Sequence, residues 1–173
     1  SLGKLDQHVP RDELVPHATA LAAAVDVPLN LDAERCFADT PSGVAETVND
    51  FEIKSGQLAL TKSSNEFVRA YATRAIAEHT TIAQSLSRNR AEAGVTMAPD
   101  EEVRKIADDA MTRLNSLQGA EFDTAFADAQ LRVQTAAVAQ YGAYSQNGAS
   151  GVLRRHAEVT LPQLQSLLEA AKR

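Results

Sequence analysis

The sequence predicts an all-α protein, built as an antiparallel four-helix bundle with an extra helix in one connection and an N-terminal segment packed on it. Apolar residues recur at steps of three and four in several long segments, which is the period of a helix. Ala and Leu supply much of the 44% apolar content, Trp is absent and aromatics make up 5%. Such a mix is typical of helices packed through small side chains. The 173 residues suffice for one core, so we expect one bundle domain.

Residues 1–41 differ in composition from the bundle that we expect over 42–173. They contain four of the six prolines and three Lys or Arg against seven Asp or Glu, so this segment is acidic and broken into short pieces. A helix is predicted only at about 12–25. The apolar residues are too many for a solvated tail, and we therefore expect the segment to pack along the bundle. They are Leu14, Val15, Leu21, Val25, Leu29, Leu31 and Phe37.

The first bundle helix is predicted from near Thr40 to about Leu60, with Thr40 or Ser42 as its cap. Glu52 falls at the edge of the inward face, and Gly56, four residues on, is expected to leave space beside it. The predicted seam is Val44, Val48, Phe51, Ser55 and Leu58.

The second helix begins with a capping box, Ser63 and Glu66, and ends at Gly94. The short turn before it predicts that the first two helices are antiparallel neighbours. One stripe runs along this helix, with His79 in its middle, and consists of Val68, Ala72, Ala75, His79, Ile82, Leu86 and Ala93.

Three further helices are predicted, one capped by Asp100 and ending near Gly119, one over 121–146 and one over 150–172. Pro162 is predicted to kink the last helix or to split it at Leu161. The third helix has a stripe of Val103, Ile106, Ala107, Ala110, Met111 and Leu114. The inward face of 121–146 is predicted to hold Phe122, Phe126, Ala129, Val133, Ala136, Gln140 and Ala143. That of 150–172 is predicted to hold Val152, His156, Val159, Leu164, Leu167 and Ala171.

Composition and motifs exclude several classes of function. The net charge is −6, with no run of Lys or Arg, which argues against nucleic acid binding. No run of 18 apolar residues occurs, so we expect no transmembrane segment. The single Cys36 cannot form an internal disulfide and has no zinc-type partner. Neither a Gly-x-Ser-x-Gly elbow nor a phosphate-binding Gly loop is present, so no catalytic residues are predicted.

Helical bundles can hold metal centres in their cores, and a di-iron site requires Glu residues on two helices and Glu-x-x-His on the other two. The chain contains no Glu-x-x-His. The polar residues that the pattern places inside or near the core are Glu52, Glu78, His79, Asp123, Gln130, Gln134 and His156.

Four segments in order, DFEIKSGQLAL, RAIAEHTTIAQSL, FDTAFADAQLRVQTA and TLPQLQSLLEAA, resemble the bacterial family known as domain of unknown function 4142, over Val44 to Ala171. The resemblance implies a ferritin-like bundle that is exported to the periplasm or associated with the outer membrane. It also implies that the family's helix-one glutamate is Glu52 and that its acidic-histidine pair is Glu78 and His79.

Two positions depart from the family pattern. Family members tend to place a histidine where this chain has Gln134, and often another where it has Leu167. Leucine cannot bind a metal, and an amide is a poor ligand for zinc or iron. An inherited metal site is therefore expected to be weakened or lost.

Each polar candidate also has a structural interpretation. For His79 the alternatives are a buried histidine bonded to Glu52 or to a backbone carbonyl, a metal ligand, and an exposed ring. Glu52 is expected to be the partner of His79, to be solvated, or to ligate a metal. Glu78 points about 100° away from His79 and is expected on the solvated face. Asp123 fits helix capping, and His156 fits packing or partial exposure.

Three hypotheses of function follow. The leading one is a non-enzymatic, exported bundle, a stress-related or interaction domain that binds another protein and keeps a degenerate metal site. The second is a Fe, Mn or Zn protein using Glu52 and His79, with Glu78 or His156 as a further ligand. The third is an apolar ligand carrier that uses the space beside Gly56.

Overall fold

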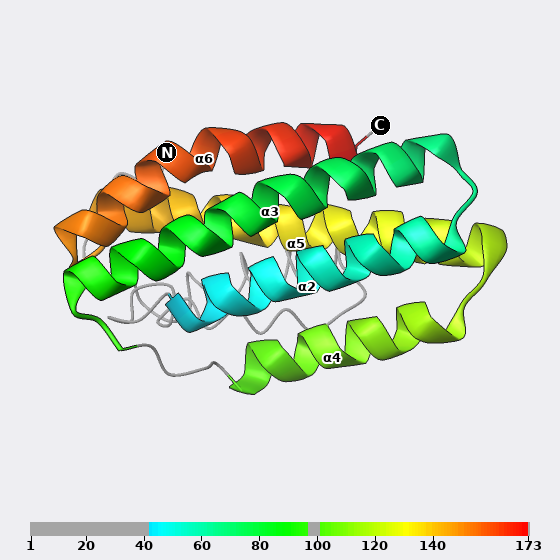
Figure 1. Ribbon diagram of the computed structural model, residues 1–173, viewed down its shortest axis with the longest axis horizontal. Helices are drawn as coiled ribbons and strands as arrows, with labels where there is room; N and C mark the ends of the chain where they lie inside the picture. The colour runs from blue at the N-terminus through cyan, green and yellow to red at the C-terminus, as the bar shows by residue number, and fades with distance from the viewer. Residues whose placement is uncertain (1–41, 97–100, 173) are drawn as a thin grey trace, which may run out of the picture. The chain divides into compact units, whose positions relative to one another are not determined.

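The computed structural model describes residues 42–96 and 101–172, which form helices joined by short connections, with no strand among them (Figure 1). The chain divides into two units, Ser1–Arg35 and Cys36–Arg173, and the described residues belong to the second. The all-α prediction is confirmed. The predictions for residues 1–41 and for the Asp100 cap lie outside the described residues. The helices are α2 (Ser42–Lys62), α3 (Glu66–Ala93), α4 (Glu101–Ser116), α5 (Gly119–Asn147) and α6 (Gly151–Ala171).

The helices pack side by side as a bundle (Figure 1). Helix α2 packs against α3 and α5, and α6 packs against α5 and α3. Helix α4 lies outside these four and contacts α2 and α5. The connection that contains α4 travels back along the bundle, so α3 and α5 run in the same direction (Figure 1). None of the described helices has both the length and the apolar character that a membrane span needs.

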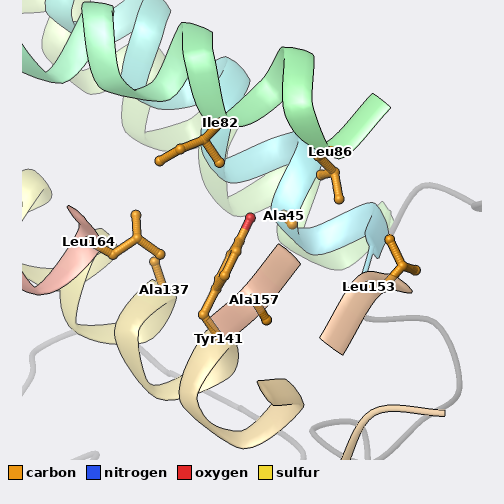
Figure 2. Packing of buried hydrophobic residues seen from close by; sticks show 8 residues of the cluster. All are labelled: Ala45, Ile82, Leu86, Ala137, Tyr141, Leu153, Ala157 and Leu164. Atoms are coloured by element: carbon orange, nitrogen blue, oxygen red, sulfur yellow. The ribbon is translucent and has the colours of Figure 1, made fainter. Parts of the chain in front are cut away.

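Two apolar clusters fill opposite ends of the bundle. The first cluster joins the start of α2 to the end of α3, and Figure 2 shows Tyr141 in its centre. Its buried residues are Ala45, Ile82, Leu86, Ala137, Tyr141, Leu153, Ala157 and Leu164. The second cluster joins the end of α2 to the starts of α3 and α5. Its buried residues are Phe51, Ala59, Ala72, Leu114, Phe122, Ala125 and Phe126.

The ends of α3 are formed by Asn65 and Gly94. The Asn65 side chain accepts hydrogen bonds from the backbone nitrogens of Phe67 and Val68, which makes it the N-cap. The predicted Ser63 capping box is therefore wrong, because Ser63 Oγ instead accepts from the backbone nitrogen of Asn65 at 3.0 Å. Gly94 adopts φ 65° and ends the helix as predicted.

Helix α6 runs through Pro162 without interruption, so the predicted split is wrong. Proline removes one helical hydrogen bond and crowds the preceding turn. Both halves of α6 are nevertheless fixed by buried side chains, Thr160 on one side of the proline and Leu164 on the other. Packing on the core thus keeps the helix continuous.

The α3 stripe is confirmed, but several predicted inward faces are rotated. Val159 of α6 is 65% exposed because Thr160 takes the inward position, and Ile106 of α4 is 45% exposed. The residues actually buried on α5 are Phe122, Ala125, Phe126, Gln130, Gln134, Ala137 and Tyr141. Those on α6 are Leu153, His156, Ala157, Thr160, Leu164 and Leu167. On α2 the inward line is Ala45, Asn49, Glu52, Gly56 and Ala59, with Phe51 and Ser55 beside it.

Candidate functional site: a buried polar layer

A set of polar side chains lies between the two apolar clusters and is closed to solvent. We call it the polar layer, and every member is at most 3% exposed. On α3 and α5 its members fall between the residues of the two clusters, and on α2 they lie between Ala45 and Ala59. The members are Asn49, Glu52, Ser55, His79, Gln130 and Gln134.

His79 is held from two sides by side-chain amides. Its Nδ1 lies 2.8 Å from Asn49 Oδ1, and its Nε2 lies 2.8 Å from Gln134 Nε2. An amide nitrogen can only donate, so Nε2 of the ring accepts and Nδ1 carries the proton that is donated to Asn49. The ring is therefore a neutral imidazole with both nitrogens hydrogen-bonded.

Burial lowers the pKa of His79 to about 4. No carboxylate bonds to the ring, so nothing compensates the cost of bringing a charged imidazolium into the core. The interpretation of His79 as a buried histidine is correct, but its partners are Asn49 and Gln134. The expected bond to Glu52 or to a backbone carbonyl is wrong.

Glu52 is fully buried, which corrects the expectation that it lies at the edge of the inward face or is solvated. With the Gln130 amide nitrogen turned toward it, Gln130 donates to Oε1 at 3.1 Å and also to Oε2. In that orientation the Gln130 oxygen accepts from Ser55 Oγ at 3.0 Å. Burial raises the pKa of Glu52 to about 8, and a hydrogen bond with Gln134 acts in the opposite direction. Burial thus favours the uncharged acid form of Glu52 at neutral pH.

Two tyrosines border the polar layer. Burial raises the pKa of Tyr71, Glu52 raises it further, and a hydrogen bond with Gln134 acts against this rise. Burial also raises the pKa of Tyr141, and Asn49 acts against it. Three polar atoms here have no hydrogen-bond partner in the structure, namely Asn49 Nδ2, Gln134 Oε1 and Tyr141 Oη. The layer is buried but not fully satisfied.

Glu78 and Asp123 lie apart from the polar layer. Glu78 is half-buried and forms an ion pair with Arg74 at 2.7 Å, so the expected fully solvated position is only partly correct. Asp123 is half-buried in the first turns of α5. Across residues 42–96 and 101–172, no group of three or more His, Cys, Asp or Glu side chains is placed to hold a metal ion.

His156 is the second buried histidine of the described residues. It lies at the end of the bundle that the first cluster fills. It is 3% exposed, which agrees with its predicted packing role. Its Nδ1 lies 3.4 Å from Ser85 Oγ, and its ring centre lies 6.0 Å from that of Tyr141. It also borders a surface groove of about 450 Å³ between α3 and α6. Neither of these two contacts involves a member of the polar layer.

Asn49 and Tyr71 are the functional candidates that sequence reasoning missed. Asn49 stands in the series 45, 49, 52, 56 and 59, whose steps of four and three are those of a helical stripe. That series includes Asn49, Glu52 and Gly56, so it is less apolar than the neighbouring series that begins with Val44 and Val48. A helical stripe that is allowed to include small residues and amide residues identifies the buried face of α2.

The comparisons with known proteins agree with the resemblance in the sequence. The model of the family described as domain of unknown function (DUF4142) matches residues 38–173. The chain therefore belongs to this family. No match was found among curated proteins or among solved structures.

Proposed function

We propose that this chain is a non-enzymatic helical-bundle protein on a ferritin-like scaffold, and that its polar layer is a degenerate metal site. The observation that carries the proposal is the pair of amide bonds to His79. A histidine ligates a metal through the lone pair of an unprotonated nitrogen. Here Nδ1 carries a proton toward Asn49, and the lone pair of Nε2 is directed at Gln134.

Gln134 supports the proposal in a second way. Family members tend to have histidine at this position, and the glutamine here lies beside the His79 ring and the Glu52 carboxyl group that a metal would use. A neutral Glu52 further weakens the site, because a carboxylic acid must lose its proton before it can ligate. The layer is thus arranged as a hydrogen-bonded core.

The connection through α4 supports the ferritin-like assignment. Ferritin-like bundles differ from simple up-and-down bundles by one long crossover connection, and α3 and α5 run in the same direction in this chain (Figure 1). From the family resemblance we also infer export to the periplasm or outer membrane and a stress-related or interaction role with a protein partner. Fractionation of cells that express the full-length protein tests its location.

Metal binding through Glu52 and His79 is the second candidate function, and one observation favours it. Gln134 lies next to both side chains, because its amide nitrogen donates to His79 Nε2 and it also lowers the pKa of Glu52. Movement of this one amide would therefore free a ring nitrogen close to the Glu52 carboxyl group. Iron, manganese and zinc are the metals that such a histidine and carboxylate suit.

An apolar ligand carrier would need space beside Gly56, and that expectation is wrong. A Cβ atom on Gly56 would lie 2.8 Å from Ile76 Cγ1, so Ile76 fills the space. The cavity beside Tyr141 has a volume of about 30 Å³, which suits about one water molecule. We therefore do not propose a carrier.

Metal analysis separates the two remaining candidates. Protein purified without chelator is analysed for metals and then titrated calorimetrically with Fe²⁺, Mn²⁺ and Zn²⁺. We expect no tight stoichiometric binding. One tightly bound equivalent that is lost in His79→Ala and kept in His156→Ala would overturn the degenerate site and establish the second candidate. His156→Ala is the matched control because it also removes a buried histidine.

A further inference from the structure

We propose that α4 is a movable cover over the polar layer, and that Lys62 holds it closed. Helix α4 contacts α2 and α5. Leu114 is its one buried side chain among those the structure describes, and Ile106 is 45% exposed. An element with so little buried apolar surface opens at a lower free energy than the helices around it.

Helix α4 contacts α2 and α5, the two helices that carry five of the six members of the polar layer. Its buried Leu114 belongs to the second cluster, and Leu58 of α2 and Ala129 and Val133 of α5 pack against that same cluster. Leu58 lies three residues beyond Ser55, and the two α5 residues lie on either side of Gln130. Ser55 and Gln130 connect in turn to Glu52. Opening of α4 therefore gives solvent a route to the layer between α2 and α5.

Lys62 attaches α4 to α2 through several hydrogen bonds. It is the last residue of α2, and its ammonium donates to the carbonyl oxygens of Leu114 at 3.2 Å, Asn115 at 2.6 Å and Leu117 at 2.9 Å. These oxygens belong to the last turn of α4 and the turn that follows, where carbonyl groups lack helical partners and attract a cation. The ammonium also lies 5.6 Å from the centre of the Phe122 ring.

One side chain thus joins the ends of α2 and α4 to the start of α5. Hydrogen bonds to a charged group are stronger than neutral ones. Removal of the ammonium is therefore expected to weaken mainly the attachment of α4. This inference concerns access of solvent to the layer and does not depend on whether the layer binds a metal.

Thiol labelling tests the proposal. Ser55→Cys is introduced into a Cys36→Ser background, and the rate of reaction with a small thiol reagent is measured under native conditions. Ala75→Cys is the matched control, since Ala75 is equally buried but lies on α3. Lys62→Met is expected to speed labelling at position 55 about tenfold or more, with little change at position 75. Lys62→Arg, which keeps a charged donor, is expected to stay close to the wild-type rate.

Equal acceleration at positions 55 and 75 would overturn the proposal, because it would mean global unfolding. No acceleration at position 55 would overturn it as well. Amide hydrogen exchange tests the same proposal without the cysteine substitutions. In the otherwise native chain, amides of α4 are expected to exchange faster than those of α2 and α5, and Lys62→Met is expected to speed α4 selectively. Uniform exchange across helices α2 to α6 would contradict a movable α4.

Discussion

Gln134 Nε2 lies 2.8 Å from His79 Nε2 in the interior of the bundle, so a glutamine amide occupies the side of the imidazole that a metal would need. This contact makes the histidine a hydrogen-bond acceptor. It also connects α5 to α3 between two apolar clusters.

Replacement of Gln134 by histidine is expected to create zinc binding. The new imidazole would face His79 beside Glu52 and supply the ligand type that Zn²⁺ prefers. We expect affinity for Zn²⁺ at least tenfold above wild type by calorimetry, and no such gain in Gln134→Leu. Combination with His79→Ala should abolish the gain. A Gln134→His variant with wild-type affinity would show that the layer cannot assemble a site.

The stability of the protein is expected to fall between pH 6.5 and 8 because of Glu52. Its pKa is about 8 when folded and 4.5 when unfolded. The folded chain therefore holds one more proton within that window, and the free energy of unfolding decreases as pH rises, by about 1.4 kcal/mol per pH unit. Urea unfolding at intervals of pH measures this slope. In Glu52→Gln the slope over this range is expected to vanish, and a variant that keeps it would rule out Glu52 as the cause.

His79 is expected to act in the opposite direction at lower pH. Its pKa is 6.5 unfolded and about 4 folded, so the unfolded chain binds the extra proton and stability falls as pH drops from 6.5 to 4. Burial also lowers the pKa of His156, which therefore acts in the same direction as His79. Between pH 4.5 and 6.5, His79→Gln should make stability rise less steeply, or fall more steeply, with pH than in the wild type, as measured by urea unfolding. A pH dependence that is unchanged in the variant would contradict the assignment.

Gly56 and Gly142 offer a matched pair of substitutions. Alanine normally stabilises a helix interior by up to about 1 kcal/mol over glycine. At Gly56 the new methyl would meet Ile76 Cγ1 at 2.8 Å and the Ala72 carbonyl oxygen at 3.3 Å, so Gly56→Ala is expected to destabilise by about 1–3 kcal/mol. At Gly142 no atom lies within 4 Å, and Gly142→Ala should stabilise. Thermal unfolding compares the two, and equal effects would contradict the close α2–α3 contact.

The α3 cap gives a further test of the structure. Asn65→Ala removes the acceptor for the backbone nitrogens of Phe67 and Val68, and should cost about 1 kcal/mol in the free energy of unfolding. Ser64→Ala, at an exposed neighbouring position, is the control and should be close to neutral. A larger loss at Ser64 than at Asn65 would show that the helix begins elsewhere.

Helix positions were largely predictable from the sequence, because long apolar stripes and terminal signals such as Gly94 are local features. The faces of α5 and α6 were less predictable. Ala, Gln and Thr occupy both buried and exposed positions in this chain, so a stripe one residue away looks equally apolar. Val159 illustrates this, since the more apolar residue is exposed and Thr160 is buried.

The candidate site was predictable in part. Glu52, His79, Gln130 and Gln134 were among the polar residues placed inside or near the core, although only His79 lay on a predicted stripe. Their pairing was not predictable, because it depends on how α2, α3 and α5 are rotated against one another. Asn49 was missed for that reason, although it is the partner that fixes the proton on His79.

The most direct test of a closed, degenerate site is the ¹⁵N NMR spectrum of the His79 ring, recorded with and without one equivalent of Zn²⁺. The structure predicts a neutral ring protonated at Nδ1, which titrates near pH 4 and whose resonances do not change when Zn²⁺ is added. Changes in the His79 nitrogens that saturate at one equivalent of Zn²⁺, without matching changes at His156, would contradict it.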